Sequence, residues 1–315
     1  MPLRLFAFLM ILLAAAGARA EPVNAVCTTG MVADVVRNVG GDRVAVTTML
    51  GSGVDPHLYK PTRTDMLTLM GADVVFYSGL LLEGKMTDAL IRVARSRPVV
   101  AVTEAIDEDQ LLSPESLQGH HDPHVWMDPG RWAHTVDVVA AELSKLDPDG
   151  ATGFRERAET YKQELARLHE YARGALASVP EDRRVLVTAH DAFNYLGARY
   201  SYEVVGIQGI STESEAGVAH IENLVTLLVE RKIPAVFIET TVADRNIRAL
   251  IAGAAAKGHE VTIGGELFSD AMGPQGTYTG TYIGMIDHNV TTIARALGGD
   301  APAGGMQGKL EAEGK

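Results

Sequence analysis

The chain has 315 residues, a formal net charge of −12 at pH 7 and one cysteine. The negative charge argues against nucleic acid or an anionic membrane surface as the partner, because both repel an acidic protein. A single cysteine excludes an intramolecular disulfide, so the stability of the fold has to come from a hydrophobic core.

The first residues have the pattern of an export signal. Arg4 precedes an apolar run at 5–16, and Ala18, Arg19 and Ala20 form the small-x-small pattern that a signal peptidase cleaves. The apolar run is about a dozen residues long, shorter than the roughly 20 that a membrane-spanning helix needs. We therefore expect a signal peptide at 1–20, cleaved near Ala20, and a soluble periplasmic protein that is long enough for two domains.

Strands and helices alternate through the first half of the remaining chain. This alternation over short connections predicts a mostly parallel sheet. Cys27 lies in the first of the predicted strands and lacks the residues of a lipobox before it, so we interpret it as a buried strand residue rather than an acylation site. Hydrophobic periodicity predicts strands at 25–29, 44–49, 74–77 and 99–102, helices at 31–39, 64–70, 82–93 and 132–146, and a polar loop at 107–123.

A change of composition follows at 151–178. This stretch contains no proline and few β-branched residues, so its helix propensity is high throughout. At 1.5 Å per residue such a helix is roughly 40 Å long, which is about the diameter of a domain. We interpret it as one long helix that joins two lobes; an ordinary helix within a single domain is the alternative.

The alternation then resumes, and the predicted fold class is α/β with two lobes. The glycine-rich segment at 298–315 has no apolar periodicity and is expected to be disordered. We expect a signal peptide at 1–20, an N-terminal lobe at 21–150, an interdomain helix at 151–180 and a C-terminal lobe at 181–297. The second lobe is predicted to have strands at 185–188, 203–207, 235–239 and 260–263 and helices at 193–200, 219–230, 246–256 and 278–297.

Four side chains that commonly bind metals follow predicted strands or precede a helix. His57 lies in the loop after the second strand, His124 lies between the polar loop and the next helix, His190 directly follows a strand of the second lobe, and Asp270 lies beyond the last strand. Ligands of open α/β sheets bind outside the carboxyl ends of the strands. Three imidazoles and one carboxylate would complete the coordination of a divalent transition metal. Their spacing alone does not establish such a site.

Several separated motifs resemble those of a known family. They lie at 53–62 (GVDPHLYKPT), 124–129 (HVWMDP), 188–193 (TAHDAF), 238–241 (IETT) and 267–270 (LFSD). Together they are similar to the cluster A-I metal-binding solute receptors of ABC transporters for zinc, manganese and iron, which include the periplasmic zinc-uptake proteins. The resemblance covers essentially the whole chain after the signal peptide.

The resemblance implies both the architecture and the role of the protein. It implies two α/β lobes joined by a rigid long helix, with one metal ion in the cleft and delivery of that ion to an ABC permease. It also implies that His57 and His124 of the first lobe, and His190 and Asp270 of the second, are the metal ligands.

Departures from the family pattern leave the choice between zinc and manganese open. Manganese- and iron-type members commonly have glutamate where this chain has His190, whereas three imidazoles favour zinc. The residues at 55–57 (DPH) are closer to the corresponding motif of the manganese-like branch. The His-rich insertion of zinc-type members is represented only by 118–123, in which His120 and His121 either form a weak accessory site or are simply solvated.

Other residues near the motifs have structural explanations. Glu239 either orients a ligand histidine or forms a salt bridge at the strand end. Asp128 before Pro129 is expected to cap the following helix. Trp126 and Phe193 are expected to pack beside the site. No role is predicted for the remaining histidines: His134, His169, His220, His259 and His288.

Three classes of function are compatible with a metal site. We favour a transport receptor, which binds one Zn²⁺ or Mn²⁺ reversibly, acts as a monomer and performs no catalysis. An exported zinc-dependent hydrolase would need an open coordination position and a general base, and a fourth ligand such as Asp270 leaves little room for water. A metal-stabilised surface adhesin is the third class, which the lack of repeats and of a lipobox disfavours.

Overall fold

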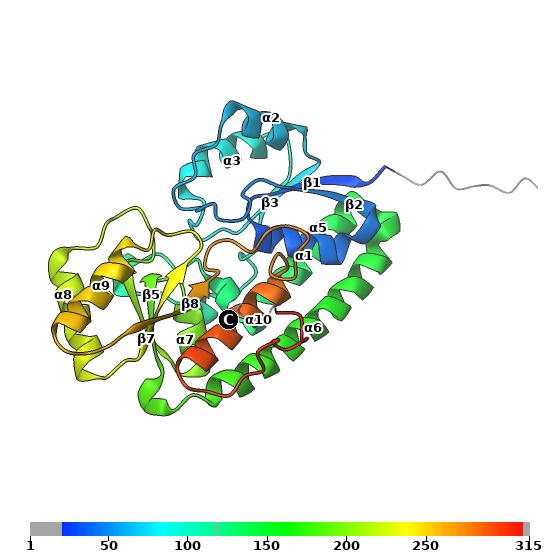
Figure 1. Ribbon diagram of the computed structural model, residues 1–315. Helices are drawn as coiled ribbons and strands as arrows, with labels where there is room; N and C mark the ends of the chain where they lie inside the picture. Colours follow the sequence, from blue (N-terminus) through cyan, green and yellow to red (C-terminus); the bar gives the residue numbers. More distant parts are fainter. Residues whose placement is uncertain (1–20, 118, 311–315) are drawn as a thin grey trace, which may run out of the picture.

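The structure is a computed structural model that describes residues 21–117 and 119–310. Within them the chain forms two α/β lobes, and a long helix, α6, runs along one side of the molecule (Figure 1). None of the helices in these two stretches has the length and apolar character needed to cross a membrane. The predicted signal peptide at 1–20 and its cleavage site lie outside the described residues.

The N-terminal lobe contains one parallel sheet of four strands in the order β2-β1-β3-β4. Cys27 is the last residue of β1 and is fully buried, as predicted. The lobe consists of β1 (Val23–Cys27), α1 (Gly30–Gly40), β2 (Val44–Thr48), α2 (Arg63–Gly71), β3 (Val74–Tyr77), α3 (Thr87–Ala94), β4 (Val99–Ala101), α4 (Pro129–Trp132) and α5 (His134–Leu146).

Both faces of this sheet are covered, because successive side chains of a strand point to opposite faces. Ala25 and Cys27 of β1 belong to the main hydrophobic core, together with residues of α1, α5 and α6. Val26, which lies between them, packs with Leu69 of α2 and Val93 of α3 on the other face. The apolar runs predicted as strands are therefore buried on two sides, which is typical of parallel sheets.

Helix α6 (Ala151–Ala177) contacts helices of both lobes. It packs against α1 and α5 of the N-terminal lobe and against α10 of the C-terminal lobe. Tyr161 donates a hydrogen bond to Asp34 of α1 at 2.6 Å, and Tyr171 is 2.7 Å from the Thr291 hydroxyl of α10. The predicted long connecting helix is confirmed.

The C-terminal lobe has two pairs of parallel strands, β5–β6 and β7–β8, and β5 lies next to β7. Val187 of β5 and Val236 of β7 pack with α8 and α9, whereas Leu186 and Phe237 join the main core. The lobe consists of β5 (Val185–His190), α7 (Asn194–Tyr200), β6 (Glu203–Gln208), α8 (Val218–Glu230), β7 (Ala235–Glu239), α9 (Arg245–Ala256), β8 (Thr262–Leu267) and α10 (Tyr282–Ala296).

Two helices begin about one turn later than predicted. The helix expected from residue 82 begins at Thr87, because the preceding residues Gly84–Met86 form a 3-10 turn instead of an α-helical one. The last helix begins at Tyr282 rather than at residue 278, because the hydroxyl of Thr281 accepts the N–H of Gly284 and caps it.

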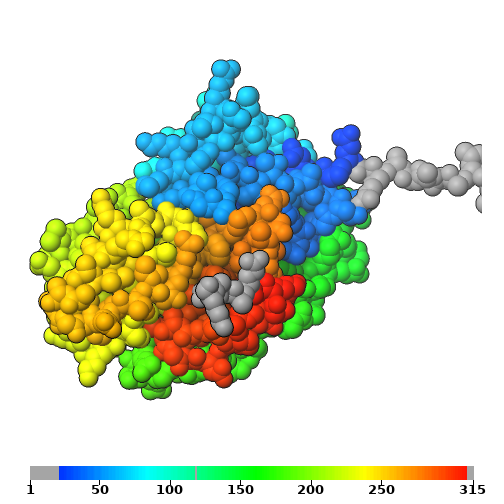
Figure 2. All heavy atoms as spheres, viewed as in Figure 1, coloured from blue at the N-terminus to red at the C-terminus, as the bar shows by residue number. Residues whose placement is uncertain are grey.

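The predicted disorder of the glycine-rich tail is wrong for residues 298–310. This segment folds back on α10, where the buried carboxylate of Asp287 accepts the backbone N–H of Met306 at 2.8 Å. Ala301 is also buried. Figure 2 shows this red segment lying on the surface of the molecule. Order here comes from hydrogen bonds to one buried acid rather than from apolar periodicity; residues 311–315 lie outside the described part of the chain.

Candidate metal centre

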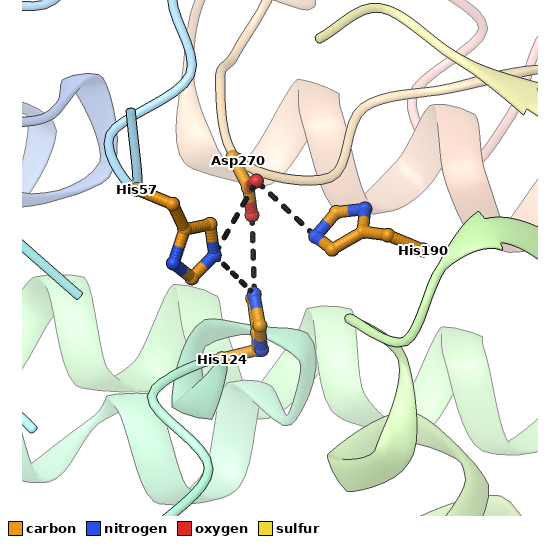
Figure 3. Close-up of side chains that lie close together, drawn as sticks. All are labelled: His57, His124, His190 and Asp270. Atoms are coloured by element: carbon orange, nitrogen blue, oxygen red, sulfur yellow. Dashed lines mark hydrogen bonds and ion pairs between the residues drawn. The ribbon is translucent and has the colours of Figure 1, made fainter. Parts of the chain in front are cut away.

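The four side chains that the sequence analysis selected meet in the structure (Figure 3). His57 comes from the loop after β2 and His124 from the residue before a short 3-10 turn at Val125–Met127. His190 is the last residue of β5, and Asp270 lies three residues after the end of β8. Each lobe therefore contributes two side chains, and their assignment as metal ligands stays a prediction.

One potential ligand atom from each residue lies within 4.8 Å of all the others. Asp270 is central: its Oδ1 is 3.3 Å from His124 Nε2, and its Oδ2 is 3.2 Å from His190 Nε2 and 3.7 Å from His57 Nε2. His57 Nε2 and His124 Nε2 are 3.3 Å apart. All four residues are buried, with exposed fractions of 5% or less.

Three polar atoms of this group are buried without a hydrogen-bond partner among the described residues. They are Nε2 of His190 and both carboxylate oxygens of Asp270. Buried polar atoms are nearly always paired, because an unpaired one loses its interactions with water and gains nothing in return. A metal ion would bond to these atoms, and nitrogen and carboxylate donors suit zinc and manganese. The donor set therefore fits one divalent transition-metal ion.

Carboxylates orient two of the imidazoles. Asp122 Oδ1 is 2.7 Å from His124 Nδ1, and Glu239 Oε2 is 2.5 Å from His190 Nδ1. Each acid also accepts the backbone N–H of the same histidine. This pairing leaves Nε2 of each ring facing Asp270, as a metal-binding histidine requires.

The structure decides between the two interpretations of Glu239 in favour of the contact with a candidate ligand histidine. Sequence analysis missed Asp122, which lies two residues before His124 in the polar loop. A signal was present, because an aspartate so close to a candidate ligand can accept a hydrogen bond from its ring or backbone.

His57 is held by its own loop. Asp55 Oδ1 accepts the N–H of His57 at 2.8 Å, and its other oxygen accepts the hydroxyl of Thr212 from the C-terminal lobe at 2.5 Å. Asp55 thus positions the backbone of one candidate ligand and links the two lobes beside it.

Burial and the local charges separate the pKa values of the three imidazoles. Burial lowers the pKa of His57 to about 4, although Asp270 opposes the shift. Burial also disfavours protonation of His124, but Asp122 and Asp270 outweigh it and raise its pKa to about 9. For His190, Glu239 and Asp270 overcome burial and hold the pKa well above its ordinary value.

The pKa of Asp270 is lowered, whereas those of His124 and His190 are raised. Burial favours the neutral form of Asp270, but the nearby imidazoles of His190, His124 and His57 hold its pKa well below the ordinary value. These shifts favour a charged carboxylate at Asp270 and protonated imidazoles at His124 and His190 when no metal is bound. These protons occupy nitrogens that a metal would need, so metal and protons compete for the site.

Trp126 packs beside the cluster, as predicted. Its ring lies edge-on to His124 with centroids 5.2 Å apart, and its Nε1 donates to the carbonyl of Ser269, the residue before Asp270, at 2.8 Å. Phe193 is fully buried in the main core. Trp126 therefore connects the candidate ligands of one lobe to those of the other.

Asp128 caps α4 as predicted and also links the lobes. Its carboxylate accepts the N–H groups of Gly130 and Arg131 and pairs with Arg199 of α7 at 2.7 Å. A second link comes from Asp122, whose Oδ2 accepts the side chain of Asn194 at 3.0 Å. The histidine region is thus tied to α7 at two points.

The accessory histidines do not form a second cluster. His120 is exposed, and His121 is 2.9 Å from the Ser113 hydroxyl and 4.0 Å from Glu108. Among residues 21–117 and 119–310, the group at His57, His124, His190 and Asp270 is the one with three or more close metal-binding side chains.

A family model and curated relatives match most of the chain. A family model described as "Zinc-uptake complex component A periplasmic" matches residues 25–296. The chain is 47% identical over 277 residues to the manganese-binding lipoprotein MntA of Bacillus subtilis (strain 168), covering 88% of this chain and 90% of that one. It is 46% identical over 272 residues to the zinc-binding protein TroA of Treponema pallidum (strain Nichols), covering 86% and 88%.

A solved structure of a relative has the same fold. The structure of the periplasmic zinc-binding protein TroA from Treponema pallidum superimposes with a TM-score of 0.86 at 45% sequence identity. The match covers 88% of this chain and 99% of that one. Two lobes with parallel strands and a long connecting helix are therefore shared with a solved protein.

Proposed function

Because the chain belongs to the family of periplasmic zinc-uptake complex component A proteins, we propose that it captures one divalent transition-metal ion, zinc or manganese, and delivers it to an ABC permease. The ligands are His57, His124, His190 and Asp270. The metal is cargo, so the site binds it reversibly.

One observation carries this proposal: four buried metal-binding side chains from both lobes converge on one point, and three of their polar atoms have no hydrogen-bond partner among the described residues. Such an arrangement costs free energy in the metal-free protein. Metal coordination would recover that free energy, because the ion would bond to the atoms that otherwise have no partner.

Catalysis is not part of the proposal. A catalytic zinc site keeps one position for water beside three protein ligands. Here a fourth protein side chain, Asp270, lies within 3.7 Å of all three imidazoles. Capture followed by release agrees with a full set of protein ligands, and with the substrate-binding role of the family.

The proposal includes the organisation of the chain and its location. The N-terminal lobe spans 21–150, the connecting helix 151–180 and the C-terminal lobe 181–297, so that the ion is held between the lobes. The protein is exported by the segment at 1–20, which is cleaved near Ala20, and acts in the periplasm as a monomer.

A competition titration tests the choice of metal. Zinc forms more stable complexes than manganese with nitrogen and oxygen donors in general, so we expect zinc to displace manganese from the metal-stripped protein at a stoichiometry of one. Relatives whose names specify manganese and zinc are almost equally similar to this chain, which is why the comparison has to be made on this protein. Failure of either metal to bind at one equivalent would contradict the proposal.

The affinity for metal should increase with pH. His124 has a pKa of about 9 in the metal-free protein, so its imidazole is protonated at pH 7, and the pKa of His190 is raised as well. Coordination displaces these protons, and each displaced proton changes the affinity about tenfold per pH unit below the pKa. We therefore expect affinity to rise between pH 6 and pH 8 by at least about tenfold per unit.

Calorimetry counts the displaced protons directly. Titrations at pH 7 in two buffers with different ionisation enthalpies should show release of one to two protons per metal ion. A heat that is the same in both buffers would mean that no net proton is released, which would contradict the expected competition between protons and metal at His124.

Loss of an orienting carboxylate should weaken binding while leaving all four ligands in place. Glu239→Gln removes the charge that holds Nδ1 of His190, and Asp122→Asn does the same for His124. Changes to such partners typically cost 10–100-fold in metal affinity. We expect a loss of about that size in each variant, measured by competition with a chromophoric chelator.

A matched control distinguishes this effect from a general loss of negative charge. Glu222→Gln removes one exposed carboxylate on α8. It should change the affinity less than about twofold, because an exposed charge is screened by solvent and salt. An equal loss in the control and in Glu239→Gln would refute the orienting role.

A further inference from the structure

The candidate ligand Asp270 is held in place differently from two of the histidines. A carboxylate orients each of the rings of His124 and His190. By contrast, both carboxylate oxygens of Asp270 are without a hydrogen-bond partner among the described residues. Asp270 also lies in a loop, three residues after the end of β8. The position of its carboxylate therefore depends on what holds the backbone of this loop.

The side chain of Asn289 holds the loop two residues before Asp270. Its Oδ1 accepts the N–H of Phe268 at 2.9 Å, and its Nδ2 donates to the carbonyl of Phe268 at 2.7 Å. Asn289 lies on α10 and is fully buried. Because an asparagine amide has both an acceptor and donors, it satisfies the two backbone groups of one residue together.

Phe268 requires such a partner because strand pairing ends just before it. The β7–β8 ladder runs as far as Leu267, which pairs with Glu239. Among the described residues, β8 pairs with no strand other than β7. Backbone N–H and C=O groups away from water need partners. Asn289 therefore takes the place of a neighbouring strand at the point where the chain leaves β8.

Two further contacts hold the same segment. The Nε2 atom of His288, also on α10, is 2.9 Å from the carbonyl of Glu266, and its ring lies edge-on to Phe268 with centroids 5.0 Å apart. Trp126 of the N-terminal lobe donates to the carbonyl of Ser269 at 2.8 Å. The segment that leads to the candidate ligand is thus attached both to α10 and to the other lobe.

The two oxygens of Asp270 face different imidazoles (Figure 3). Its Oδ1 is 3.3 Å from His124 Nε2, and its Oδ2 is 3.2 Å from His190 Nε2. A shift of the loop backbone would move both oxygens relative to the rings. Carboxylate oxygens suit manganese, whereas imidazole nitrogens suit zinc. Binding of manganese should therefore depend on the position of Asp270 more than binding of zinc does.

We propose that Asn289 is a positioning residue for metal binding, which acts through the backbone of Phe268 to keep both carboxylate oxygens of Asp270 directed at the imidazoles. This inference rests on the proposed function, because Asn289 affects the metal only if Asp270 is a ligand.

Asn289→Leu tests this role, because leucine has a similar size but makes neither hydrogen bond. The affinities of the metal-stripped variant for Zn²⁺ and Mn²⁺ are measured by competition with chelators. We expect the Mn²⁺ affinity to fall about tenfold, the lower end of the range for partners that contact a ligand directly. The Zn²⁺ affinity should fall less, so the preference for zinc over manganese should rise several-fold.

Thr291→Val is the matched control on the same helix. It removes a buried hydroxyl that is 2.7 Å from the hydroxyl of Tyr171 on α6. Both variants should lower the free energy of unfolding in urea, because each leaves polar groups without their partners. Only Asn289→Leu should change the ratio of the two metal affinities. An equal change of this ratio in both variants would show a general effect of destabilisation and overturn the inference.

Asn289→Asp provides the test if the leucine variant does not fold. Aspartate has the same size and still accepts the N–H of Phe268, but its ionised form cannot donate to the carbonyl. Zn²⁺ and Mn²⁺ have the same charge, so the added carboxylate leaves the ratio of their affinities unchanged, whereas movement of Asp270 raises it in favour of zinc.

The outcomes separate this inference from the proposed function. Tight binding of one equivalent by the unchanged protein, with an unaltered affinity ratio in folded Asn289→Leu, overturns the role of Asn289 and leaves the proposed function intact. The same ratio in Asn289→Asp has that meaning if the leucine variant does not fold. If neither metal binds the unchanged protein at one equivalent, the proposed function itself fails.

Discussion

His190→Ala is expected to abolish tight metal binding, with a loss of affinity greater than about 100-fold. Changes to residues that merely orient a ligand cost 10–100-fold, and His190 is proposed to bond to the metal itself. Removing its ring also leaves Glu239 buried without the imidazole that it pairs with. The affinity for zinc, measured by competition with a chelator of known strength, gives the size of the loss.

His134 provides the matched control. It is an exposed histidine at the start of α5, and it is not part of the metal-binding group. His134→Ala should bind zinc as the unchanged protein does. Retention of tight binding in His190→Ala would show that the metal is held elsewhere, and the proposed site would have to be abandoned.

Trp126→Ala should lower the free energy of unfolding of the metal-free protein by about 3–5 kcal/mol. Truncation of a buried tryptophan has a cost of this size, because transfer free energy is lost and a cavity remains. Trp126 is fully buried, lies edge-on to Trp132 with centroids 6.3 Å apart, and donates to the carbonyl of Ser269 across the lobe boundary. Urea unfolding monitored by circular dichroism measures the change.

Two further variants show where this effect comes from. Leu67→Ala on α2 truncates a side chain that is 67% exposed, and it should change stability by less than about 0.5 kcal/mol. Trp126→Phe keeps most of the buried area but leaves the Ser269 carbonyl without its donor, a cost of about 1–3 kcal/mol. A loss below 1 kcal/mol in Trp126→Ala would contradict the packing seen here.

The sequence alone determined the α/β class and the order of the elements. Local rules were sufficient, because apolar runs with short connections become buried parallel strands, and the proline-free stretch from residue 151 becomes α6. Strand ends also selected His57, His190 and Asp270, since the carboxyl ends of parallel strands face the ligand-binding side of a sheet. The motif containing His124 added the fourth residue.

Only the tertiary structure decided how these residues interact. Glu239 pairs with His190 across 49 positions of sequence, and Trp126 reaches Ser269 across 143. Asp287 orders a tail in which local periodicity is absent. The periodicity of apolar residues predicts which face of an element a side chain is on. The hydrogen bonds and the pKa of that side chain depend on which groups from distant parts of the chain lie next to it in a buried, low-dielectric environment. That is why the candidate ligands could be identified from the sequence, while their orienting partners and their protonation required the fold.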